Sequence, residues 1–314
     1  MQLIVLGTGA GGGCPQWNCG CANCNFAREN PLSARTTDSL AFRYKNAGRD
    51  NWAIVNPGVD LRHQLAKHAQ LQPPADGAVR NTPIQSVIVT DGELDHTMGL
   101  INLREGAALK VFATGIVLEL METAFPVRSV LKNYARLEFV KIIPGQPFFL
   151  ADDLKVTAFA LSDKLPRYAK DSESLLTAEF SGAVIGLKFE SADSVIAYAP
   201  QIGVWDRRVD SLFSGAEIIL ADGTFYTTDE MSSLGLEAGS AESMGHLPLS
   251  GEGGILAHLH EAKAPVKLLT HINNTNPILR DNSPERQAVE NAGVKIAVDG
   301  MCLSAGKVGE MLRD

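Results

Sequence analysis

Side chains that can bind a metal or transfer protons crowd one short segment of the chain. The apolar run Val87–Thr90 is followed within six residues by four of them: Asp91, Glu93, Asp95 and His96. Loops that follow buried strands are where proteins commonly hold such groups. A solvated acidic turn would explain the carboxylates alone, but it would not explain the matching residues that appear later in the chain.

The segment Thr90–Leu100 resembles the signature of metallo-β-lactamase-fold hydrolases, a strand followed by T-H-x-H-x-D-H-x-x-G-L. Here the signature reads T-D-G-E-L-D-H-T-M-G-L. His271, after the strand-like run Val266–Thr270, resembles the metal-binding histidine of the closing strand. His246, before the helical run Gly251–Ala262, resembles a histidine of the tRNase Z-like and phosphodiesterase branches. The resemblance implies an α/β fold of the αββα type, in which two mixed β-sheets are flanked by helices.

The chain departs from this signature where the first metal site of the fold would lie. The histidine positions of that site hold other residues here: Asp91, Glu93 and Asp163. Pro200–Gln201 stands where a bridging aspartate would follow a strand. A dinuclear hydrolase needs two metals that share a hydroxide nucleophile. We therefore expect the hydrolytic machinery to be lost.

The second metal site of the fold is retained as Asp95, His96 and His271. Two imidazoles and one carboxylate with open coordination positions form the ligand set of non-haem Fe(II) oxygenases. We expect these residues to bind Fe²⁺, although Zn²⁺ fits the same ligands. Further groups are expected to serve as auxiliary ligands or as a general base: Asp91, Glu93, Asp222 and His246.

A separate, structural metal site is predicted near the N-terminus, in a cysteine-rich loop at about residues 14–26. Cys19, Cys21 and Cys24 place three thiols within six residues, and such spacing lets a loop enclose one tetrahedral Zn²⁺. The alternative is three free cysteines in a turn. The fourth ligand is left open among four kinds of residue: Cys14, Cys302, a histidine and Asn274. In the similar phosphodiesterase branch, a histidine at the position of Asn274 completes the zinc site.

Five segments along the chain resemble the family of coenzyme PQQ (pyrroloquinoline quinone) synthesis B proteins: Met1–Cys24, Thr90–His96, Met244–Ser250, Leu269–Pro277 and Val298–Met301. The resemblance extends over nearly the whole chain. It implies a small-molecule substrate, a Glu–Tyr-derived PQQ precursor, whose tyrosine ring is hydroxylated with iron and O₂. Two alternatives stay open, a carrier that binds PQQ or an intermediate and assists transport, and a metal-dependent hydrolase.

The elements that must position these residues are short strands rich in Val, Ile and Phe, with helices between some of them. The predicted strands are Leu3–Leu6, Trp52–Val55, Val87–Thr90, Lys110–Ala113, Phe139–Ile143, Lys155–Ala160, Ala183–Phe189, Val195–Tyr198, Glu217–Leu220, Val266–Thr270 and Lys295–Val298. The predicted helices are Leu61–Leu71, Ile116–Met121, Arg207–Phe213, Gly251–Ala262 and Pro284–Ala292. Early strands come in hairpin-like pairs and helices interrupt them later. This mixture favours helix-covered sheets in a single domain over residues 1–314.

Three other features of the sequence can be interpreted structurally. Gly7–Gly12 fits the G-x-G-x-x-G pattern of dinucleotide-binding folds, but no helix is expected to follow it, so a tight glycine turn is favoured. The polar stretch Asp163–Ser174, which contains Tyr168 and Lys170, is predicted to be a lid over the site. The three tryptophans are expected to pack in the interior: Trp17, Trp52 and Trp205.

The charge and hydropathy of the chain exclude several classes of partner. The formal net charge is −8 and no dense Lys/Arg cluster occurs, which argues against a nucleic-acid ligand. No apolar run reaches the roughly 18 residues of a membrane span. The N-terminal apolar run lacks a basic flank and meets glycines at once, so it predicts a strand of a cytoplasmic protein. The oligomeric state is left open, with a homodimer as one alternative.

Overall fold

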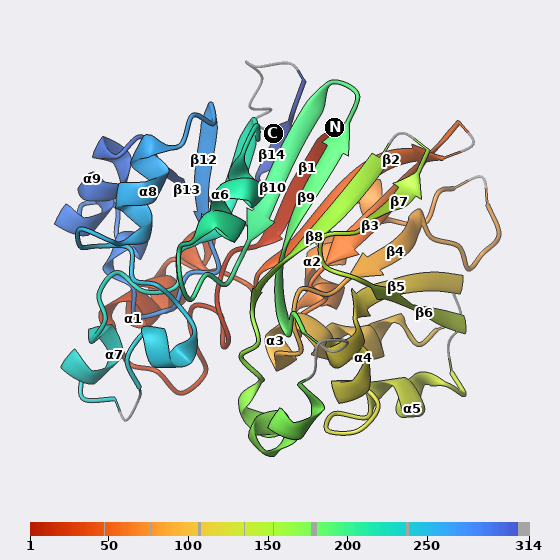
Figure 1. The fold of residues 1–314 in the computed structure, drawn as a ribbon, viewed down its shortest axis with the longest axis horizontal. Coiled ribbons are helices and arrows are strands. Elements are labelled where there is room, and N and C mark those ends of the chain that lie inside the picture. The colour runs from red at the N-terminus through yellow and green to blue at the C-terminus, as the bar shows by residue number, and fades with distance from the viewer. Residues whose placement is uncertain are drawn as a thin grey trace.

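Two seven-stranded β-sheets lie face to face, with helices on their outer faces (Figure 1). The computed structural model describes residues 1–46, 48–75, 77–105, 108–134, 136–152, 154–176, 181–236 and 239–306. The αββα fold predicted from the sequence is confirmed. Within the described residues, no helix combines the length and the apolar character needed to cross a membrane.

The first sheet has the strand order β14-β1-β2-β3-β4-β5-β6. Its strands are β1 (Gln2–Gly7), β2 (Ser39–Asn46), β3 (Arg49–Val55), β4 (Ile84–Ile88), β5 (Ala108–Thr114), β6 (Arg136–Ile142) and β14 (Cys302–Ser304). The pairs from β14 to β3 are antiparallel, and the pairs from β3 to β6 are parallel.

The second sheet repeats this design, with the order β13-β12-β11-β10-β9-β8-β7. Its strands are β7 (Pro147–Ala151), β8 (Leu154–Ser162), β9 (Val184–Ser191), β10 (Ser194–Ala199), β11 (Ile218–Asp222), β12 (Val266–Thr270) and β13 (Lys295–Ile296). The pairs from β7 to β10 are antiparallel, and those from β10 to β13 are parallel.

Helices cover both outer faces and shield the apolar side chains there. The α-helices are α1 (Ala22–Glu29), α2 (Leu61–Lys67), α3 (Leu94–Thr97), α4 (Gly115–Leu120), α5 (Val127–Leu131), α6 (Arg207–Phe213), α7 (Glu230–Ser233), α8 (Ile255–Glu261) and α9 (Pro284–Asn291). The 3₁₀ turns are η1 (Pro31–Ser33), η2 (Ala69–Leu71), η3 (Met98–Leu103), η4 (Arg167–Leu175), η5 (Glu242–Met244) and η6 (Pro277–Leu279). Side chains of α6, α8 and α9 pack on the second sheet, and those of α4 and α5 pack on the first.

The main core lies between the sheets and joins them into one structure. Phe42 of β2 stacks on Phe189 of β9 with ring centroids 3.8 Å apart. Leu3 and Val5 of β1 belong to the same buried cluster as Leu220 of β11. Since parallel strands end at one edge, the loops that follow β4, β10, β11 and β12 can meet there.

Several sequence predictions need correction. The strands β2, β7 and β14 were not predicted, because each is short or mixes apolar with polar residues. The cysteine-rich loop is partly helical, since α1 begins at Ala22. Trp52 is buried as predicted, but Trp17 is 89% exposed, because its turn packs on the protein through Cys14 and Cys19. The simple reading of the glycine-rich segment is confirmed, since no α-helix begins before Ala22.

Candidate metal centre

Three histidines and one aspartate from separate segments converge at the carboxyl ends of the strands. His96 lies on α3 after β4, His271 follows β12, and His246 precedes α8. The rings of His96 and His271 have centroids 5.2 Å apart, and those of His246 and His271 stack at 5.4 Å. Asp95 Oδ2 lies 3.5 Å from His271 Nε2 and 3.9 Å from His96 Nε2. The ligand atoms of Asp95, His96 and His271 lie within 4.8 Å of one another, as a shared metal requires.

Each of the three imidazoles is held by a hydrogen bond at its Nδ1 atom. The partner of His96 is Asp91. Both carboxylate oxygens of Asp91 lie within hydrogen-bond distance of His96 Nδ1, at 2.9 and 2.8 Å. The carboxylate can only accept, so Nδ1 carries a proton and donates it, and Nε2 is the nitrogen left for a metal. An acceptor behind the ring is the usual means of orienting a metal-binding histidine.

The other two histidines are held in the same way. Asp222 Oδ2 lies 2.8 Å from His246 Nδ1. The Thr224 hydroxyl donates to Asp222 Oδ1 at 2.6 Å and can therefore accept from His271 Nδ1, which lies 2.8 Å away. One carboxylate thus fixes two rings, directly for His246 and through Thr224 for His271, and leaves both Nε2 atoms as possible ligands.

His96 Nε2 is the observation that tests whether the site fits a metal. This atom is buried and has no hydrogen-bond partner among the residues that the structure describes. A buried polar nitrogen without a partner is costly, because it has lost its water and gained nothing in return. A cation coordinated between His96 Nε2, His271 Nε2 and the Asp95 carboxylate would satisfy it. The residues present therefore fit a metal ion.

The electrostatics of the centre also favour a cation. Burial lowers the pKa of His96, but Asp91 and Asp95 outweigh this and raise it to about 10. Burial raises the pKa of Asp95, and the nearby His96 and His271 reverse this and hold it well below its usual range. The protein thus surrounds the imidazoles with carboxylates that stabilise positive charge, whether a proton or a metal ion carries it.

The predicted auxiliary residues occupy different places. Asp91 and Asp222 are almost fully buried, and the oxygens of both carboxylates already accept hydrogen bonds from imidazole, hydroxyl and backbone groups. These hydrogen bonds orient the imidazoles, and the ligand atoms of Asp222, His246 and His271 also lie within 4.8 Å of one another. Glu93 is about one-third exposed, and burial together with Asp91 and Asp95 raises its pKa to about 7.

Asp163, which occupies a histidine position of the fold's first metal site, is not part of either histidine cluster found among the described residues. Its Oδ1 accepts hydrogen bonds from the backbone N–H groups of Gly182 and Ala183. Tyr168 of the predicted lid donates from its hydroxyl to the Gly92 carbonyl at 2.6 Å, which joins this segment to the acidic loop. Lys170 of the same segment is exposed.

The backbone at His271 adopts an unusual conformation, with φ at 54°. The left-handed region is disfavoured for a residue with a Cβ, and such residues collect at functional sites. Ile272 holds this turn in place, because its N–H donates to Thr8 O at 2.8 Å and its carbonyl accepts from Ala10 N at 2.9 Å. Gly11 N–H donates to Asp95 Oδ2 at 3.0 Å. The glycine-rich turn therefore supports two of the predicted ligands.

Sequence reasoning missed a buried polar layer beneath the centre. Asp38 is fully buried and accepts hydrogen bonds from the hydroxyls of Thr270 and Tyr198. Burial raises its pKa. Asn56 donates to Tyr198 and Thr90, and so links both sheets. The only signal in the sequence is a polar run before β2, which reads as an ordinary turn.

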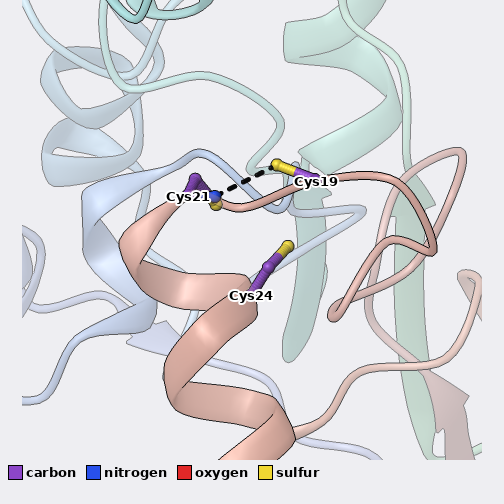
Figure 2. Close-up of side chains that lie close together, drawn as sticks. All are labelled: Cys19, Cys21 and Cys24. Carbon is purple, nitrogen blue, oxygen red and sulfur yellow. Dashed lines mark hydrogen bonds between the residues drawn. The ribbon is translucent and has the colours of Figure 1, made fainter.

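The three predicted zinc-binding thiols lie together at the start of α1 (Figure 2). Cys19 and Cys21 come from the preceding turn, and Cys24 from the helix. The Asn274 side-chain nitrogen lies 3.1 Å from Cys19 Sγ, 3.7 Å from Cys21 Sγ and 3.3 Å from Cys24 Sγ. Of the four alternatives for the fourth ligand, Asn274 thus has its side chain directed at all three sulfurs. Cys302 packs in a different apolar cluster.

Comparisons with known proteins agree with this architecture. The beta-lactamase superfamily domain matches residues 51–272. A coenzyme PQQ synthesis protein B from Cupriavidus necator is 40% identical over 309 residues, 96% of this chain and 98% of that protein. One from Klebsiella pneumoniae is 36% identical over 307 residues, 97% of this chain and 98% of the other. The crystal structure of zinc-bound PqqB from Methylobacterium extorquens has a TM-score of 0.84 at 30% identity and covers 97% of this chain and 100% of that one.

Proposed function

The chain belongs to the coenzyme PQQ synthesis protein B family of the beta-lactamase superfamily, and we propose that it hydroxylates the tyrosine ring of a Glu–Tyr-derived precursor with iron and O₂. A role in PQQ biosynthesis and a metal-dependent enzyme fold are supported by its relatives. The hydroxylation itself is inferred from the ligand chemistry. The observation that carries it is the unpartnered His96 Nε2 beside a second imidazole and a carboxylate.

Asp95, His96 and His271 would hold the iron, which when bound supplies the redox chemistry that O₂ requires. The chain's own contribution is to fix the ligands. Asp91 and Thr224 hold the Nδ1 atoms of the two imidazoles, so that their Nε2 atoms face the centre. Gly11 N–H fixes one oxygen of Asp95.

Two further groups lie where they can act on the substrate. His246 stacks beside His271 with its Nδ1 held by Asp222, so its Nε2 can serve as an additional ligand or accept a hydrogen bond. Glu93, with a pKa of about 7, can accept or return a proton at neutral pH. In the overall reaction one oxygen atom of O₂ replaces a ring hydrogen as hydroxyl. The other leaves as water, with two electrons from an external reductant and two protons from solvent.

The Cys19, Cys21 and Cys24 cluster is assigned to structural Zn²⁺ within this proposal. Three thiolates with one more ligand make a closed tetrahedral site, which has no open position for a substrate. Asn274 supplies the fourth position, provided that its amide turns to present oxygen, since an amide nitrogen cannot bind a metal cation while it is a donor.

The hydroxylation is tested with iron-loaded protein, a Glu–Tyr dipeptide, ascorbate and ¹⁸O₂. We expect O₂ uptake and one ¹⁸O atom in the tyrosine ring by mass spectrometry, with both signals lost in His271→Ala. Tight binding of PQQ without ¹⁸O incorporation would instead support a carrier. Turnover of a simple phosphodiester by the zinc-loaded protein would support a hydrolase. Either result would overturn the hydroxylase.

A further inference from the structure

Next to the metal centre lie a lysine and a glutamine that the function proposed above does not use, Lys164 and Gln201. We propose that they form a binding site for a carboxylate of the substrate and so set its orientation toward the metal. This inference rests on the proposed function only for the reaction that the carboxylate-bearing ligand then undergoes. The binding site itself is argued from geometry and charge.

Gln201 follows β10 at the edge where the metal centre lies. Its neighbour Ile202 donates from its backbone N–H to Asp222 Oδ2, the oxygen that also holds His246. The side chain of Gln201 is 4% exposed, and its amide nitrogen lies against the backbone of Gly245, the residue before His246. An amide nitrogen so close to His246 can donate a hydrogen bond to a ligand that enters the centre.

Lys164 lies near the acidic segment that precedes His96. Its Nζ is 4.0 Å from Glu93 Oε1, within the acidic segment that carries the predicted ligands. Its side chain is about one-third exposed, so the ammonium group can reach a molecule that enters the centre. A lysine in this position offers a positive charge and three hydrogen-bond donors.

Gly245, which precedes His246, brings the two side chains together. A Cβ atom at Gly245 would lie 2.5 Å from Gln201 Nε2 and 2.5 Å from Lys164 Cδ. Both side chains therefore pass over the same bare stretch of backbone beside His246. The φ of 88° at Gly245 also favours glycine. An amide donor and an ammonium donor that converge beside a metal fit a carboxylate group, with the ammonium supplying the charge.

Lys164 could instead be only a counterion for Glu93. An ion pair at 4.0 Å between partly exposed groups contributes little stability. It would also give the Gln201 amide beside Gly245 no part in ligand binding. The two interpretations differ in what a substitution does to ligand binding, and that difference can be measured without turnover.

The test is calorimetric binding of two probes to zinc-loaded protein, the Glu–Tyr dipeptide and the same dipeptide with both carboxyl groups amidated. We expect Lys164→Met and Gln201→Leu to weaken binding of the dipeptide roughly 10- to 100-fold, the usual cost of losing a charge-assisted hydrogen bond. Binding of the diamide should change less than about threefold. Lys170→Met, an exposed lysine of the same segment, serves as the matched control and should leave both affinities unchanged.

Equal losses for both probes, unchanged binding in both variants, or no binding of the dipeptide to the wild type would each overturn the carboxylate site. Zinc content and thermal midpoint measured on every variant distinguish lost recognition from lost folding. The outcome is separable from the proposed function. If the wild type incorporates no ¹⁸O while the carboxylate-specific loss persists, the hydroxylation fails and the binding site stands.

Discussion

At the scale of single residues, the centre is a set of imidazoles whose Nδ1 atoms are already hydrogen-bonded within the protein. Asp91, Thr224 and Asp222 fix the rings of His96, His271 and His246. The orientation of each ring is therefore set before any ligand arrives, which lowers the cost of ordering the site when a metal binds.

Removing a predicted ligand should abolish metal binding while the fold survives. We expect His271→Ala and Asp95→Ala to lose the active-site metal and at least 100-fold in ¹⁸O incorporation, because each removes one of three ligands. Metal analysis and circular dichroism provide the measurement. His260→Ala changes an exposed histidine of α8 and should keep both metal and activity. Full activity in the Asp95 variant would refute its role as a ligand.

Removing an orienting carboxylate should weaken the metal rather than abolish it. Asp91→Asn keeps the shape of the side chain but removes the charge that holds His96 Nδ1–H, and we expect metal affinity to fall about 10- to 100-fold. Competition with a coloured chelator measures this. Asp163→Asn is the matched control, since its carboxylate binds only backbone N–H groups in the described structure. An equal loss in both variants would contradict the assignment.

At the scale of elements, the turn after β12 connects the two candidate metal sites. His271 and Asn274 lie three residues apart, and Asn23 of α1 donates from its side chain to the carbonyls of Asn274 and Asn276 at 2.9 and 2.8 Å. The glycine-rich turn binds Ile272 on the other side. The zinc-binding segment should therefore act on the active site by holding this turn.

Loss of the thiol cluster should reach the active site through that turn. We expect Cys24→Ala to lose one zinc per chain, to lower the thermal midpoint by several degrees, and to weaken the active-site metal several-fold. Cys302→Ala, in a different cluster, should change none of these. Zinc content, calorimetry and metal competition give the three readings. An active-site affinity that does not change in Cys24→Ala would show that the two centres are independent.

The contact between α7 and the same turn should make stability depend on pH. Glu230 is 6% exposed, and burial raises its pKa from 4.5 to about 7, although Thr275 and Tyr226 donate hydrogen bonds to it. The folded protein therefore binds this proton more tightly than the unfolded chain, and the charged form costs stability as pH rises from 4.5 to 7. The cost levels off above pH 7.

Glu230→Gln should remove this pH dependence. Relative to the wild type, the variant should gain on the order of 2–3 kcal/mol in unfolding free energy between pH 4.5 and 8, because it has no charge to bury. Urea unfolding at intervals of one pH unit measures the difference. Glu252→Gln, an exposed control in the loop before α8, should follow the wild type. A constant difference at every pH would rule out titration of Glu230.

At the scale of the whole molecule, the two sheets depend on each other. The chain builds most of the first sheet, then the second, and returns to the first with β14, which pairs with β1. The Met1 amino group donates to Ala305 O, and Figure 1 shows β1 and β14 side by side. Neither sheet can bury its inner face without the other, so we propose that residues 1–314 form a single domain.

A single domain should unfold in one cooperative step. We expect one calorimetric transition with a van't Hoff enthalpy close to the calorimetric enthalpy. Phe42→Ala and Phe189→Ala, which remove the two halves of one stacked pair between the sheets, should each lower the midpoint of that transition without splitting it. Two separate transitions in either variant would show that the sheets fold independently.

The sequence by itself determined the fold class, and it predicted the chemical character of both candidate sites. Three features carried these predictions, and each is a pattern of neighbouring residues that can be recognised without the structure. They are the motif from Asp91 to His96, the histidine after β12, and the spacing of Cys19, Cys21 and Cys24. The strands next to the site were predictable for the same reason, because a buried apolar run of that length needs no partner to be recognised.

The tertiary structure decided which of these side chains act on which. Asp91 and Asp222 cannot be distinguished from ligands by type, and only their positions behind the imidazoles make them orienting groups. Asp38 was invisible in the sequence because its partners lie 160 and 232 residues away. Such pairings depend on how the strands of the two sheets are aligned with one another where they end. That alignment is set by the packing of the whole core and not by residues that are neighbours in the sequence.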